Sequence, residues 1–192
     1  GSSFRSRGEG MPLMPQRDDR QQSGTARLTR LALLTAIALC IFTAEAQLPS
    51  LTAIPGIKLG LANVVTVFAM YALGPGATLC IVLVRVTLGC IATGQMMAFL
   101  FSMTGGLLAF CVSALLRRWF APEQMWVVSV FAAVAHNLGQ LAVAIAVMGT
   151  TAIGYYLPVL LISGVITGAF TGFCGQFTYA RLAKSLQIKP IQ

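Results

Sequence analysis

Residues 76–93 read GATLCIVLVRVTLGCIAT, and a single residue within this run, Arg85, carries a charge. A helix rises 1.5 Å per residue, so a run of this length comes close to crossing the roughly 30 Å hydrocarbon core of a bilayer. The stretch is therefore typical of a membrane-spanning helix. A charge in the middle of such a helix is costly, which makes Arg85 the first candidate for a functional residue.

Further apolar runs lie on both sides of this one, and together they predict six membrane-spanning helices. The runs cover residues 28–47, 57–74, 76–93, 95–117, 125–148 and 155–180. The sequence Gly74-Pro75-Gly76 separates the second run from the third, because proline removes a backbone donor and glycine permits a tight turn. The predicted fold class is an all-α integral membrane bundle.

The composition excludes a soluble globular domain. Hydrophobic residues make up 57% of the chain and charged residues only 9%, whereas about 25% charged is usual. The mean hydropathy is +0.81. The net charge of +8 comes mainly from the two tails and one loop, so we interpret it as a topology signal and expect lipid, not nucleic acid, as the surroundings.

The basic residues predict the orientation of the helices. They precede the first run, follow the fourth and follow the sixth: Arg17, Arg20, Arg27, Arg30, Arg117, Arg118, Arg181, Lys184 and Lys189. Cytoplasmic loops hold an excess of lysine and arginine, so both termini are expected in the cytoplasm of a plasma-membrane protein. A second interpretation stays open, because Leu31–Ala44 has the length of a signal-peptide core and Ala44-Glu45-Ala46 resembles a cleavage site.

The chain is predicted to contain one folded domain between two tails. Residues 1–27 are polar and basic and hold too few apolar side chains to order themselves, so they are expected to be a disordered tail. The six-helix domain is expected to cover residues 28–182. A cytoplasmic tail follows at residues 183–192.

Ionisable and amide side chains gather in what this topology makes the outer half of the bundle. The candidate ligand-binding residues are Glu45, Lys58, Asn63, Arg85, His136, Asn137 and Gln140. Lys58 and Arg85 carry two positive charges and Glu45 carries one negative charge. The net charge of the candidate site is therefore positive, which predicts an anionic ligand. No catalytic or metal-ligating set is indicated, because the five cysteines are scattered through apolar runs.

The same residues also have ordinary structural interpretations. Glu45 can pair with Lys58 or with Arg85, and Lys58 can reach the membrane interface. His136 and Gln140 share one helix face and can hydrogen-bond to a neighbouring helix.

Small residues at four-residue spacing are a separate pattern. Gly164, Gly168 and Gly172 lie in the last run, where we predict close packing inside the bundle. Ala32 and Ala36 lie near the start of the first run. They are candidates for docking onto a partner membrane protein.

The run Gly56-Ile57-Lys58-Leu59-Gly60-Leu61-Ala62-Asn63, with Glu45 and Pro49 before it and Gly74-Pro75-Gly76 and Arg85 after it, resembles the Gx transporter family. That family is also labelled heptaprenyl diphosphate synthase component I. It is similar to the S-components of energy-coupling factor (ECF) transporters, which have six helices and cytoplasmic termini.

The resemblance implies a membrane protein that captures a small anionic micronutrient or precursor from outside. It also implies that Ala32 and Ala36 dock onto a transmembrane coupling subunit with two ATPases, and that the loop from Leu48 to Gly56 covers the pocket. The chain has no nucleotide-binding P-loop, so ATP would be used by the partners and no cofactor is expected here.

The family label implies an alternative function, a membrane subunit associated with polyprenyl diphosphate or quinone synthesis. Catalysis by the chain itself is not expected, because prenyl diphosphate synthases hold magnesium with aspartate-rich clusters. The two aspartates of this chain, Asp18 and Asp19, both lie in the predicted tail. A stand-alone secondary transporter and a structural subunit of a larger membrane complex are further alternatives.

Overall fold

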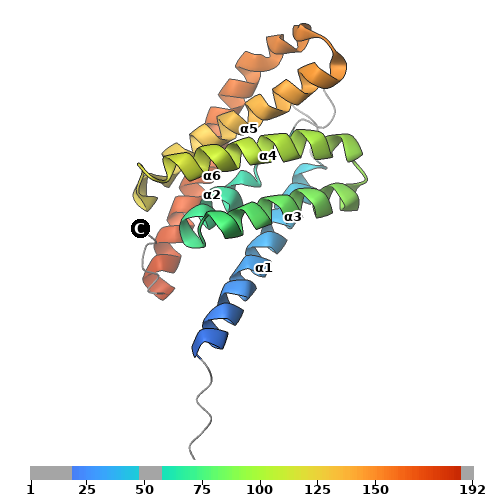
Figure 1. Cartoon of the computed structure of the whole chain (residues 1–192). Helices are drawn as coiled ribbons and strands as arrows, with labels where there is room; N and C mark the ends of the chain where they lie inside the picture. Colours follow the sequence, from blue (N-terminus) through green and yellow to red (C-terminus); the bar gives the residue numbers. More distant parts are fainter. Residues whose placement is uncertain (1–18, 48–57, 187–192) are drawn as a thin grey trace, which may run out of the picture.

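The computed structural model describes residues 19–47 and 58–186, and helices dominate this part of the chain (Figure 1). Within it there are six α-helices, two short 3-10 helices and no strand. The elements are α1 (Asp19–Glu45), α2 (Asn63–Ala72), α3 (Pro75–Thr93), α4 (Met96–Leu116), η1 (Pro122–Gln124), α5 (Met125–Met148), η2 (Thr151–Tyr156) and α6 (Leu157–Leu186). The predicted all-α class is confirmed.

Five of these helices, α1, α3, α4, α5 and α6, are long and apolar enough to cross a membrane. The chain is therefore a multi-pass membrane protein. Helix α2 has only 10 residues, about 15 Å at the helical rise, and is shorter than the predicted span of 57–74. The backbone from Lys58 to Ala62 is not helical, and Gly60 has a φ of +78°, which an α-helix cannot contain.

The first and the last helix of the chain are longer than predicted. Helix α1 begins at Asp19, inside the segment expected to be a tail, and α6 continues to Leu186, past the expected domain end at residue 182. Arginine, glutamine, lysine and leucine favour the helical state, so each helix continues beyond its apolar run. The rest of the two predicted tails lies outside the described residues.

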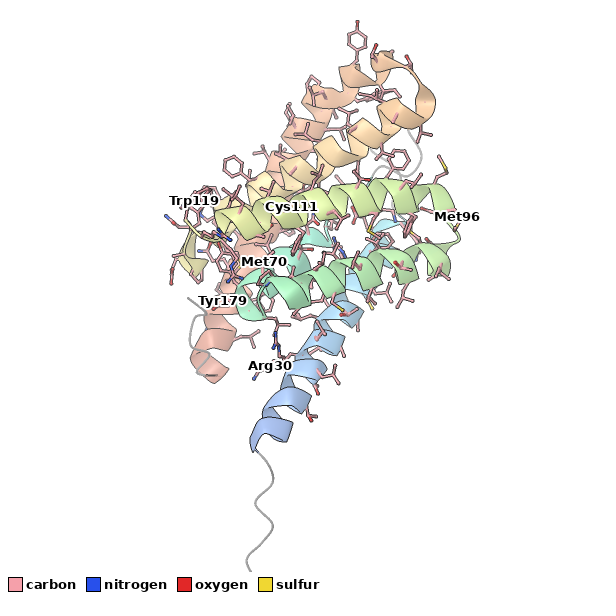
Figure 2. The ribbon with its side chains drawn as sticks, in the orientation of Figure 1. Arg30, Met70, Met96, Cys111, Trp119 and Tyr179 are labelled. Carbon is pink, nitrogen blue, oxygen red and sulfur yellow. The ribbon has the colours of Figure 1, made fainter. Side chains whose placement is uncertain are left out.

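Successive helices alternate in direction, which collects basic residues at one end of the bundle (Figure 1). In Figure 2, Trp119 and Tyr179 lie on the left of the molecule and Arg30 lies below its centre, whereas Met96 lies on the right, at the end of α4 remote from Trp119. We call the side that carries Arg30, the Arg117-Arg118 pair and Arg181 the basic end.

Helix α2 lies at the centre of the bundle and contacts all five other α-helices. Near the basic end it joins a cluster of buried side chains from α4, α5 and α6: Val67, Tyr71, Ala109, Met125, Val128, Ala132 and Tyr179. Tyr71 Oη donates to the carbonyl of Phe120 at 3.0 Å, and Arg117 Nη1 donates to the carbonyl of Met70 at 2.8 Å. The C-terminal end of α2 is thus attached to the connection between α4 and α5.

Helices α5 and α6 pack closely through the predicted glycines of α6. A Cβ atom added at Gly168 would lie 2.6 Å from Cα of Val130, and one at Gly172 would lie 2.5 Å from Cα of Trp126. Backbone atoms cannot give way as a flexible side chain can. The prediction of close packing inside the bundle is confirmed.

Replacing Gly168 with alanine is expected to destabilise the protein by about 1–3 kcal/mol, because the added methyl group pushes α5 and α6 apart. The matched control is Gly76→Ala in α3, where an added Cβ meets nothing within 4 Å. Thermal unfolding of both variants in the same detergent measures the effect. Equal Tm values would contradict this account of the packing.

Candidate ligand pocket

A pocket lies between α1, α3, α4, α5 and the non-helical segment that precedes α2. The empty volume between its lining atoms is about 240 Å³, and this volume includes the part that is open to solvent. The lining residues are Phe42, Glu45, Lys58, Gly60, Ala62, Arg85, Val86, Ser102 and His136. Four of the predicted ligand-binding residues, Glu45, Lys58, Arg85 and His136, are therefore brought together here.

The non-helical segment Lys58–Ala62 is fixed by side chains from distant helices. The backbone N–H of Gly60 donates to Oε1 of Glu45 on α1, and the backbone N–H of Lys58 donates to Oε1 of Gln140 on α5 at 3.3 Å. Non-helical backbone at membrane depth is tolerated where protein groups satisfy it or where it lines a cavity. The Glu45 carboxylate and the Gln140 amide provide acceptors of this kind.

Gly60 also allows the close approach of α5. A Cβ atom at this position would lie 2.9 Å from Cδ2 of His136, and the positive φ would be strained for other residues. Gly60 was part of the sequence run that carried the family resemblance. Its role in the pocket wall became visible only in the structure.

The Arg85 guanidinium is almost completely buried, with 2% of its surface exposed. Its Nη2 donates to Oδ1 of Asn63 at 3.1 Å, while Nε and Nη1 have no hydrogen-bond partner among the described residues. The sequence left open whether Arg85 pairs with Glu45 or contacts a ligand. No hydrogen bond joins Arg85 to Glu45 in the structure, so Nε and Nη1 of Arg85 remain available to donate to a ligand.

Lys58 lies in the non-helical segment, and its ammonium group packs on an aromatic ring. Nζ is 3.7 Å from the centre of the Phe42 ring and has no hydrogen-bond partner among the residues that the structure describes. The contact with Phe42 is a cation–π interaction, which stabilises a positive charge without using its hydrogen-bond donors.

Asn63 and Gln140 lie behind the lining residues and hold them in place. Asn63 accepts from Arg85, and Gln140 joins Lys58 to His136, whose Nε2 is 3.0 Å from Nε2 of Gln140. The structural interpretation expected hydrogen bonds to a neighbouring helix, whereas these hydrogen bonds of Gln140 run to His136 on the same helix and to the non-helical segment. This chain of contacts connects both residues to the pocket.

Asn137 is placed differently from the other candidates. Its Nδ2 donates to the carbonyl of Leu160 on α6 at 2.7 Å, and it is not among the residues that line the pocket. On an α-helix, consecutive residues point about 100° apart, so Asn137 faces α6 while its neighbour His136 faces the pocket.

Replacing Asn137 with alanine is therefore expected to reduce stability by about 0.5–1.5 kcal/mol, because one hydrogen bond to the Leu160 carbonyl is lost while Ser163 Oγ still donates to it. Ligand retention should not change. The matched comparison is Asn63→Ala, which releases Arg85 and should reduce ligand retention. Measuring Tm and retained ligand for both variants separates the two roles, and loss of ligand from Asn137→Ala would contradict the assignment.

Five lining residues were not among the ligand-binding residues predicted from the sequence: Phe42, Gly60, Ala62, Val86 and Ser102. Phe42 is one of many apolar residues of α1, and nothing in its spacing marks it as a cation–π partner. Ser102 is a hydroxyl inside the apolar run of α4, and its buried Oγ has no hydrogen-bond partner. A polar residue within a membrane-spanning run is the signal that could have identified Ser102.

The proposed docking alanines lie on the outer surface of α1. Ala32 and Ala36 are both exposed, so neither is used for packing within the described chain. The loop from Leu48 to Gly56, which the resemblance assigns as a cover over the pocket, lies outside the described residues.

Comparison with known proteins gives one family match. The sequence profile of heptaprenyl diphosphate synthase component I matches residues 34–178, a range that contains every residue lining the pocket. Comparisons with curated proteins and with solved structures gave no match. The chain belongs to the heptaprenyl diphosphate synthase component I family.

Proposed function

We propose that this protein is the substrate-binding membrane subunit of an ECF-type importer, which captures a small anionic micronutrient or precursor. The observation that carries the proposal is the pair of buried cations in the pocket. Arg85 and Lys58 both line it, and neither Arg85 Nε, Arg85 Nη1 nor Lys58 Nζ has a hydrogen-bond partner within residues 19–47 and 58–186. Buried donors of this kind favour a bound anion.

The charges of the lining residues support an anionic ligand. Lys58 and Arg85 are positive, and Glu45 is the single carboxylate among the residues that line the pocket. One positive charge is left without a counter-charge. In the proposed complex Arg85 and Lys58 face the anionic group, while Asn63 orients Arg85.

The position of the pocket supports capture from outside. The pocket adjoins the N-terminal end of α2, whereas the C-terminal end of α2 lies at the basic end. Basic residues favour the cytoplasmic side of the plasma membrane, so the pocket lies toward the outer side. The exposed Ala32 and Ala36 then lie toward the cytoplasmic half of α1, where a coupling subunit with its ATPases would dock.

The alternative function is a non-catalytic membrane subunit associated with polyprenyl diphosphate or quinone synthesis. The family description fits a membrane component of either kind. It requires the pocket to hold an isoprenoid compound or to have no ligand of its own.

Mass spectrometry of the small molecules released when the detergent-purified protein is denatured tests the proposal. The expected result is a water-soluble anion in near-stoichiometric amount. A long isoprenoid, or no released molecule, would overturn the proposal in favour of the alternative.

Docking is tested separately by affinity purification of the full chain from its native membranes. Wild-type protein should carry a transmembrane subunit and ATPases with it. Replacing Ala32 and Ala36 with leucine should remove these partners, while Leu33→Ala on the same exposed side of α1 serves as a control. Partners that survive both alanine substitutions would contradict the assignment of the docking surface.

A further inference from the structure

The pocket wall is rich in hydrogen-bond donors and poor in acceptors. Its lining residues contribute Lys58 Nζ, Arg85 Nε, Arg85 Nη1 and the Ser102 hydroxyl, all buried and without hydrogen-bond partners in the part of the chain that the structure describes. The Glu45 carboxylate is the exception, and one of its oxygens already accepts from the Gly60 backbone. A ligand group that enters this wall must therefore accept several hydrogen bonds and bring a negative charge.

His136 belongs to this wall, and its proton can be placed from its neighbours. A backbone N–H can only donate, so the Gln140 atom that faces the Lys58 amide is the oxygen Oε1. The other end of Gln140 is then an NH₂ group, which donates to Nε2 of His136. An imidazole nitrogen that accepts carries no proton, so His136 is neutral and its proton is on Nδ1.

The donors also come from three separate elements. Lys58 belongs to the segment before α2, Arg85 to α3 and Ser102 to α4. A carboxylate offers two oxygens in one plane, whereas a terminal phosphate offers three oxygens arranged around a tetrahedral centre. Arginine and lysine are the usual side chains that bind phosphate.

We infer that the pocket binds its substrate through a phosphate or diphosphate group, which Arg85, Lys58 and Ser102 hold beside a neutral His136 protonated on Nδ1. This inference rests on the proposed function, because it assumes that the pocket is a substrate site. The phosphate group has two sources that share this chemistry: a water-soluble phosphorylated compound, or an isoprenoid diphosphate presented from the bilayer.

Nuclear magnetic resonance provides a direct readout, because His136 is the single histidine of the chain. Protein purified with a histidine-free tag, labelled with ¹⁵N-histidine and placed in nanodiscs should show one protonated and one unprotonated ring nitrogen. Protonation on Nδ1 is expected. Protonation on Nε2, or on both nitrogens, would overturn the placement of the proton.

Binding is then measured with inorganic diphosphate, with an isoprenyl diphosphate added to the nanodiscs, and with acetate at matched ionic strength. At least one diphosphate should bind saturably and shift the His136 signals, whereas acetate should not. Binding of inorganic diphosphate indicates a water-soluble source. Binding of the isoprenyl compound alone indicates a lipid source. It would overturn the proposed capture of a water-soluble anion and leave the phosphate inference standing, because that inference needs from the proposed function only that the pocket is a ligand site.

Variants assign the binding to the pocket. Arg85→Gln and Lys58→Gln should each weaken diphosphate binding by about 30-fold or more, as expected when one partner of a buried charge contact is removed. Arg181→Gln, an exposed cation at the basic end, should leave it unchanged. Using two pocket variants keeps the test valid if one of them fails to fold.

The outcomes distinguish this inference from the proposed function. If the anion released on denaturation is a carboxylate whose binding depends on Arg85, and neither diphosphate competes with it, the phosphate inference is wrong while substrate capture stands. If no anion binds in an Arg85-dependent way, both are wrong.

Discussion

Replacing Glu45 with alanine is expected to destabilise the folded protein by about 3–5 kcal/mol, the usual effect of removing one partner from a buried set of charges. The substitution removes the acceptor of the Gly60 N–H inside the non-helical segment. It also removes the single carboxylate among the pocket-lining residues and leaves Lys58 and Arg85 without a counter-charge. Thermal unfolding in detergent measures the loss.

Two matched variants separate these effects of Glu45. Glu45→Gln keeps an acceptor for Gly60 but not the charge, so it should recover part of the stability. Glu123→Gln removes an exposed carboxylate of η1 and should not change Tm. If Glu45→Ala unfolds at the wild-type temperature, the carboxylate does not support the non-helical segment.

Replacing Arg85 with methionine is expected to abolish retention of the anionic ligand without destabilising the ligand-free protein. Arg85 is buried, and two of its nitrogens have no hydrogen-bond partner. An apolar side chain of similar length removes the cost of burying a guanidinium that is only partly hydrogen-bonded, so the ligand-free variant should be no less stable than the wild type. Glu45 and Lys58 then still balance each other in charge.

This result would separate the two interpretations that the sequence left open for Arg85. If Arg85 were mainly the structural partner of Glu45, Arg85→Met would lower Tm strongly. Measuring Tm after removal of the ligand, together with the amount of anion retained on purification, distinguishes them. A variant that is destabilised and still holds the anion would refute the ligand role.

Most of the fold could be predicted from the sequence because the membrane makes apolar length informative. The predicted runs 95–117 and 125–148 agree closely with α4 and α5. Helix α2 could not be delimited in this way. The chain before Asn63 leaves the helix because its backbone binds Glu45 and Gln140, and hydropathy of the segment itself contains no information about those distant partners.

The candidate site could be predicted in part for the same reason. Charged residues within apolar runs are few, so Glu45, Lys58 and Arg85 stood out at once and do lie together. Which neutral polar residues face the pocket depends on the rotation of each helix about its own axis, and the sequence alone does not give that rotation. Asn137 faces α6 and His136 faces the pocket, and a difference of one residue position could not be resolved before the packing of α5 was known.

The break in the chain before α2 also determines when the pocket can form during biosynthesis. The Gly60 amide finds its acceptor 15 residues earlier in the chain, at Glu45, whereas the Lys58 amide depends on Gln140, 82 residues later. Until α5 has entered the bilayer, the Lys58 amide lacks its native acceptor. The ten residues of α2 are in addition too few to cross the bilayer as a helix. The pocket is therefore completed only after most of the chain has been synthesised and inserted.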